Sequence, residues 1–210
     1  MIWSSKIVLV ISIGFLVMGV HHSFATPSLT VSTGKHVYAY GDFLSITFQV
    51  SELTGNPIIV HIIDSSGKAS APINISINKW NSTISSPIPF YKTTYSPGTY
   101  HINAEYAGTQ SSISFDLVDS GKIAIPTEYK TLAQTWLKGT ATDKDYAGLI
   151  RELIYFDIIN VPGYDFQTAH IIHIPVWFKT NVKWWSDDSI TDNEFGFAIQ
   201  YLINSGFMSV

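Results

Sequence analysis

Several short stretches in the first half of the chain alternate apolar and polar residues, which is the pattern of β-strands with one buried face. The clearest are 44–50, 100–106 and 113–117, and the denser apolar run 57–63 suits a central strand. Turn-forming residues such as Tyr40-Gly41-Asp42 and Ser96-Pro97-Gly98 separate these stretches. The pattern predicts about seven short strands in residues 26–119, arranged as an immunoglobulin-like (Ig-like) β-sandwich.

The last third of the chain has helical periodicity and repeats itself. An offset of 49 residues aligns residues 125–161 with 174–210 without a gap. Two apolar stripes recur at helical spacing: Tyr146, Leu149, Ile150, Leu153 and Ile154, and Phe195, Ala198, Ile199, Leu202 and Ile203. Each second helix opens with a capping-box spacing, Thr142 with Asp145 and Thr191 with Glu194. Each copy therefore reads as helix, turn, helix, with Pro126 and Pro175 at a first helical position.

These patterns predict an all-β Ig-like sandwich followed by an all-α, duplicated helix-turn-helix-type module. The expected boundaries are the sandwich at 26–119, a first copy at 120–161, a linker at 162–173 and a second copy at 174–210. We use "first copy" and "second copy" for these two ranges below.

Residues 1–25 have the composition of a secretory signal peptide. Lys6 supplies a positive charge, 7–20 is an apolar run, and Ser23-Phe24-Ala25 places small side chains at a cleavage site. The alternative is a retained anchor helix, although 14 apolar residues span only about 21 Å, against about 30 Å for the hydrocarbon core. Either reading predicts an extracytoplasmic protein, secreted or membrane-anchored and facing outside.

Composition removes several classes of function. The chain has no cysteine, which excludes disulfides, thiolate nucleophiles and cysteine-ligated metal centres. A net charge of −4 leaves no basic patch, so nucleic acid is not expected as a partner. Neither a Gly-x-Ser-x-Gly elbow nor a His-Glu-x-x-His helix occurs. We therefore expect a protein that is not an enzyme and uses no cofactor.

Two groups of residues are candidates for metal binding, and both have simpler explanations. His170 and His173 would face one metal only on a helix, whereas the isoleucine-rich segment around them favours an extended chain. Asp187, Asp188, Asp192 and Glu194 lack the spacing of an EF-hand, and helix capping explains the last two. Copper handling through His170 and His173 remains an alternative function.

Comparison of the two copies gives the candidate binding surface. Trp136 and Trp185 match each other, as do Tyr146 and Phe195, so these positions belong to a shared core. Four aromatic residues of the second copy stand opposite polar residues or glycine in the first copy: Trp177, Trp184, Phe197 and Tyr201 stand opposite Glu128, Thr135, Gly148 and Glu152. Within each pair the helical spacing places both side chains on one face. They either pack on the rest of the chain or form an exposed docking site for a protein or a glycan.

Two stretches of sequence resemble known protein families. The segments 35–42 and 97–106 resemble the Ig-like modules of secreted archaeal and bacterial surface proteins. The second copy, from Ile174-Pro175-Val176-Trp177-Phe178-Lys179 to Gly206, resembles a module of exported proteins of ammonia-oxidising archaea. That resemblance implies an extracytoplasmic accessory or docking module and brings no catalytic residues.

The function expected from the sequence is a non-enzymatic, exported interaction or structural protein of the cell surface. It would act as an accessory extracytoplasmic subunit of a membrane-associated complex, with a protein or a membrane complex as its partner. The alternatives are a periplasmic copper-handling protein and a glycan-binding module. Two glycosylation sequons, Asn74-Ile75-Ser76 and Asn81-Ser82-Thr83, are consistent with a location outside the cell.

Overall fold

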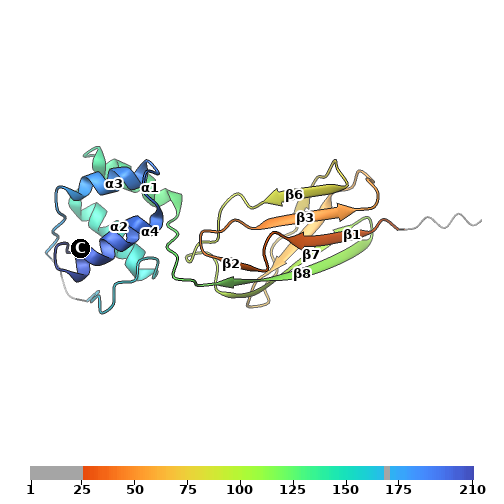
Figure 1. Ribbon diagram of the computed structural model, residues 1–210, viewed down its shortest axis with the longest axis horizontal. Coiled ribbons are helices and arrows are strands. Elements are labelled where there is room, and N and C mark those ends of the chain that lie inside the picture. The colour runs from red at the N-terminus through yellow and green to blue at the C-terminus, as the bar shows by residue number, and fades with distance from the viewer. Residues whose placement is uncertain (1–25, 168–170) are drawn as a thin grey trace, which may run out of the picture.

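The computed structural model describes residues 26–167 and 171–210, so the predicted signal segment and His170 lie outside the described residues. The strands gather at one end of the long axis and the helices at the other, and the segment after β8 joins the two regions (Figure 1). Within the described residues, no helix combines the length and apolarity needed to cross a membrane.

The strands form two sheets. One has the order β1-β3-β6, from β1 (Leu29–Thr33), β3 (Ser45–Val50) and β6 (Asn81–Ser85). The other has the order β2-β8-β7-β4-β5, from β2 (Val37–Ala39), β8 (Thr109–Val118), β7 (Gly98–Tyr106), β4 (Ile58–Ile63) and β5 (Ile73–Ile75). All pairs are antiparallel except β2 with β8. The predicted strands are present, and 57–63 does supply a strand inside its sheet.

The two sheets pack face to face as an Ig-like β-sandwich. Alternate residues of the strands bury their side chains between the sheets, and the largest of these are Tyr38, Phe48, Ile58, Ile102, Tyr106, Phe115 and Leu117. The hydroxyl of Tyr100, near the start of β7, donates to the carbonyl oxygen of Ser96 at 2.8 Å. This contact has the geometry of the tyrosine corner of Ig-like domains.

Four helices follow: α1 (Thr127–Leu137), α2 (Asp143–Tyr155), α3 (Phe178–Ser186) and α4 (Asp192–Asn204). Both predicted capping boxes are confirmed, since Thr142 and Thr191 each accept from the backbone N–H three residues later. The predicted first helical position was wrong for both prolines, since Pro126 is the N-cap residue before α1. Pro175 instead starts a turn, in which the N–H of Phe178 donates to the carbonyl of Pro175, and α3 begins three residues later.

The prediction of an all-β sandwich followed by an all-α module was also wrong. The described residues form a mixed α/β structure with eight strands in two sheets and four helices. The segment between α2 and α3 is irregular where it is described, and His173 forms a β-bridge with Ser209. Helical periodicity marks only the helices themselves, and it carries no information about the residues that join them.

The helices of the two copies pack with reciprocal contacts. Lys130 of α1 lies over the ring of Trp185 at 5.6 Å, and Lys179 of α3 lies over the ring of Trp136 at 4.8 Å. The two lysines occupy equivalent positions in the copies, as do the two tryptophans. Each copy therefore covers the central tryptophan of the other.

The sandwich and the helical region are joined by polar contacts and by the segment after β8. Lys92, before β7, pairs with Asp119 at 2.7 Å and with Asp157, after α2, at 2.5 Å. Burial lowers the pKa of Lys92, but its hydrogen bonds to the two carboxylates outweigh this effect and the pKa is raised overall. The N–H of Ile123 donates to the side chain of Asn193 at 2.7 Å, which fixes the segment to α4.

Candidate functional site: an exposed aromatic surface on α3 and α4

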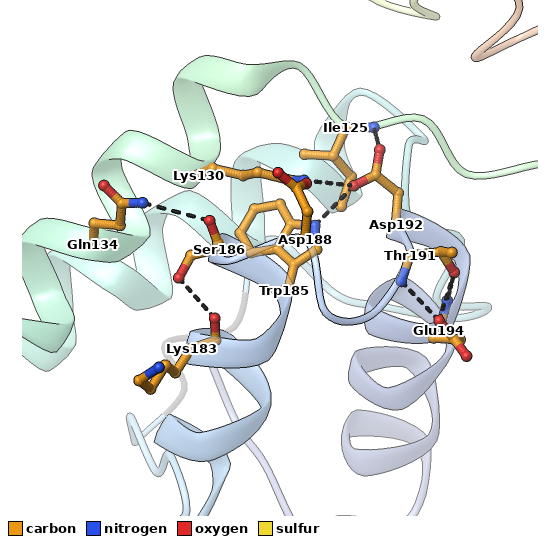
Figure 2. Close-up of polar contacts among 10 residues, drawn as sticks. All are labelled: Ile125, Lys130, Gln134, Lys183, Trp185, Ser186, Asp188, Thr191, Asp192 and Glu194. Atoms are coloured by element: carbon orange, nitrogen blue, oxygen red, sulfur yellow. Dashed lines mark hydrogen bonds and ion pairs between the residues drawn. The ribbon is translucent and has the colours of Figure 1, made fainter.

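The inner side of α3 is held by its buried tryptophan. The indole N–H of Trp185 donates to Asp192 at 2.8 Å, and its ring stacks on Phe195 with centroids 4.1 Å apart. The second oxygen of Asp192 accepts from the backbone N–H of Ile125, and Lys130 also pairs with Asp188 (Figure 2). The start of α4, the end of α3 and the start of the first copy thus meet at one point.

This anchoring decides which way the neighbouring tryptophans point. Lys179 and Ser186 contact α1, and Phe178, Val182 and Trp185 are buried. Trp177, the residue just before α3, and Trp184, seven residues later, lie on the side away from α1. Trp177 is 58% exposed and Trp184 is 48% exposed. Both side chains therefore belong to the surface.

The packing of α4 likewise determines which of its aromatic side chains are exposed. Gly196 approaches the segment after β8 so closely that an added Cβ would lie 2.4 Å from Ile123. Phe197 and Tyr201 lie on the other side of the helix, 54% and 64% exposed. The four aromatic residues that stand opposite polar residues or glycine in the first copy, Trp177, Trp184, Phe197 and Tyr201, are thus all exposed. We call these two pairs, one at α3 and one on α4, the aromatic surface.

Residues near the aromatic surface carry little free charge. The sequence from Phe195 to the C-terminal Val210 contains no Asp, Glu, Lys or Arg. Glu194 accepts from the backbone N–H and hydroxyl of Thr191, and these hydrogen bonds lower the pKa of its carboxyl group. Lys183 pairs with Asp187 at 2.6 Å. An apolar partner would therefore meet few unpaired charges along α4.

The candidate metal ligands take other roles. Asp187 and Asp188 pair with lysines, and Glu194 completes the capping box of α4. Asp192 accepts from the backbone N–H of Ile125 and from the indole N–H of Trp185, so the expectation that helix capping explains Asp192 was wrong. His173 is exposed, and its backbone pairs with Ser209. His170 lies outside the described residues. Among the residues that are described, no three His, Asp or Glu side chains gather as a metal site would require.

Sequence comparison missed one neighbour of the aromatic surface. Phe207 is 55% exposed, and its ring centroid lies 6.4 Å from that of Tyr201. Its counterpart in the first copy is Ile158, which is buried. A search for positions that are aromatic in one copy and polar or glycine in the other does not find it, because both residues are large and apolar.

Comparisons with known proteins give no family for this chain. No protein-family model and no curated protein matches it. Solved structures with a similar part include Escherichia coli alpha-2-macroglobulin activated by porcine elastase, with 13% identity and a TM-score of 0.36. That match covers 43% of this chain and only 8% of the other.

Two further solved structures are single domains. The PKD domain of an M14-like peptidase from a Thermoplasmatales archaeon has 15% identity and a TM-score of 0.26, covering 43% of this chain and 91% of that one. The Ig7 domain of Dscam1 has 18% identity and a TM-score of 0.27, covering 44% and 98%. We draw no conclusion about function from likenesses of this size.

Proposed function

We propose that this chain is an exported, non-enzymatic interaction protein of the cell surface that docks a protein partner through its aromatic surface. In this role it would serve as an accessory extracytoplasmic subunit of a membrane-associated complex. The observation that carries the proposal is the exposure of Trp177, Trp184, Phe197 and Tyr201, each of which is polar or glycine in the first copy.

The stability of the fold does not explain why these four exposed side chains are aromatic. The first copy keeps the same buried core, with Trp136 stacked on Tyr146, while carrying Glu128 and Thr135 on its surface. Large aromatic side chains are enriched at the centres of protein interfaces, where burial on binding supplies most of the affinity. The Ig-like sandwich is in addition a fold that commonly mediates contacts between proteins.

The test uses substitutions that the first copy already carries. Trp184→Thr and Trp177→Glu should change the free energy of unfolding by no more than about 0.5 kcal/mol, because they alter exposed positions. Each should weaken partner binding by about 2 kcal/mol or more. Binding is measured with the tagged full chain against its native membranes, and stability by thermal unfolding.

The matched control is Trp185, the neighbour of Trp184 that is fully buried. Trp185→Ala should cost about 3 to 5 kcal/mol of stability, because it leaves a large cavity. Unchanged partner capture by both surface variants would refute docking at these residues. If binding in wild type and its loss in the variants are seen only with isolated surface glycans, the partner is a glycan and the protein-docking proposal fails.

The proposed location has an independent test. Mass spectrometry of the protein from its native cells should find an N-terminus at Thr26, as expected for a cleaved signal peptide. An intact Met1 in the membrane fraction would establish the anchored form, and an intact Met1 in the soluble cytoplasmic fraction would refute export.

A further inference from the structure

The two sequons lie on strands that end the two sheets. Asn74 is in β5, the last strand of the five-stranded sheet, and Asn81 begins β6, the last strand of the three-stranded sheet. The strands at the other ends, β2 and β1, lie beside β8 on the opposite side of the sandwich. Both sequons thus mark the same open side of the sandwich.

Strand register shows that both asparagines point away from the core. Ile75 and Ile73 pair with the buried residues Ile58 and Val60, so Asn74 between them faces outward. Ser82 pairs with the buried Phe48, so its neighbour Asn81 also faces outward, opposite Gln49. Both asparagines are exposed.

The side-chain amides of Asn74 and Asn81 are accessible to a modifying enzyme. Within the described residues, neither amide makes a hydrogen bond to another protein atom. Two other asparagines do make such bonds: Asn103 accepts from the hydroxyl of Ser112 at 2.7 Å, and Asn193 accepts from the N–H of Ile123. The two asparagines with the acceptor sequence are therefore also available in the folded chain.

Both sites lie far from the aromatic surface. Asn74 is opposite Ile59, which pairs with Glu105 beside the β7–β8 hairpin. Asn81 is opposite Gln49, which pairs with Thr30 near the start of β1. The hydroxyl of Thr109, in that hairpin, bonds to Pro27, so both sites belong to the hairpin end of the sandwich. The helices follow Val118, at the other end of β8 (Figure 1).

From these observations we infer that Asn74 and Asn81 are N-glycosylation sites that cover the open strand edges of the sandwich and leave the aromatic surface bare. The inference rests on the proposed location outside the cytoplasm.

The co-reactant in the glycosylation reaction is an oligosaccharide activated on a polyprenyl phosphate or diphosphate. The asparagine amide nitrogen forms a bond to the anomeric carbon of the sugar, and the bond from that carbon to the phosphate oxygen breaks. The lipid phosphate leaves with the electron pair of the broken bond. A base of the transferase takes the amide proton.

A glycan at these edges has a physical use. Open edge strands present unpaired N–H and C=O groups, to which another chain can add as a further strand. Bulky, solvated sugars on the last strand of each sheet block that approach sterically. The end strands on the other side of the sandwich, β1 and β2, carry no sequon.

The experiment is peptide mass spectrometry on the protein purified from the cells that make it. Peptides containing Asn74 and Asn81 should each carry a hexose- or hexosamine-containing mass increment. The peptide containing Asn103, which is exposed but is followed by Ala104 and Glu105, should carry none. Ser76→Ala and Thr83→Val, expressed in the same cells, should each remove the increment at the neighbouring asparagine while leaving that asparagine in place.

Each outcome separates this inference from the proposed function. Unmodified Asn74 and Asn81 peptides in protein with an N-terminus at Thr26 would overturn glycosylation and leave export standing. Unmodified peptides in protein that keeps Met1 in the cytoplasm would overturn both. Increments that persist in the Ser76→Ala and Thr83→Val variants would show attachment without the sequon, and would also overturn the assignment.

Discussion

Tyr146→Phe should stabilise the protein, although it removes a polar group and adds no contact. The ring of Tyr146 is buried and stacks on Trp136, with centroids 4.0 Å apart. Its hydroxyl is also buried, and it has no hydrogen-bond partner among the described residues. Phe195 fills the equivalent position of the second copy and stacks on Trp185 at nearly the same distance, 4.1 Å.

The expected gain follows from the cost of an unpaired buried hydroxyl, about 1 to 3 kcal/mol. The void left by one oxygen atom takes back part of it, so we expect a net gain of about 1 kcal/mol in the free energy of unfolding. In a chain of this size that gain raises the melting temperature by about 2 to 4 °C. Thermal unfolding followed by near-ultraviolet circular dichroism measures the shift.

The reverse change provides the control. Phe195→Tyr places a hydroxyl at a fully buried position and should lower the melting temperature by a similar amount. A clear loss of stability in Tyr146→Phe would mean that the hydroxyl has a partner, such as an ordered water, and the reasoning about this site would be refuted.

Further changes test the packing of α4 and the pH dependence of stability. Gly196→Ala should destabilise by about 1 to 3 kcal/mol, because its Cβ would collide with the buried Ile123, whereas Gly148→Ala in α2 has open space and should stabilise by about 0.5 to 1 kcal/mol. Chemical denaturation of both variants measures the difference, and equal effects would refute the close approach of Ile123 to α4. Burial, with a hydrogen bond to Glu152, raises the pKa of Tyr129 to about 12. Because the folded state holds this proton more tightly, the stability it supplies is complete below pH 10 and is lost as the pH rises towards 12. Denaturation at stepped pH should show that loss, and Tyr129→Phe should reduce it; an unchanged pH profile in the variant would contradict the assignment.

Local patterns predicted the elements and the buried stripes well. The alternation in 44–50 and the spacing of Leu149, Ile150 and Leu153 each report the face of a single element, so the sequence alone suffices. The four members of the aromatic surface were also identified from the sequence alone, but by comparing equivalent positions of the two copies.

What the sequence did not reveal depends on contacts between distant residues. Lys92 and Asp157 are 65 residues apart, and no local pattern pairs them. Asp157 and Asp188 adopt left-handed backbone conformations with φ of 53° and 57°, at positions where the other copy has Gly206 and Gly139. Each aspartate makes an ion pair that a glycine cannot make, with Lys92 and Lys130 respectively. The strain at these positions is therefore explained only by the folded structure.

The reciprocal lysine–tryptophan contacts limit how this arrangement can change in evolution. In an open array of repeats, each unit contacts only its neighbours, so units can be added or lost at the ends. Here Lys130 covers Trp185 and Lys179 covers Trp136, so each copy completes the other. Deletion of either copy would uncover the tryptophan of the other. Growth of the region would then proceed by whole pairs, and a substitution in one copy would be selected partly for its effect on the other.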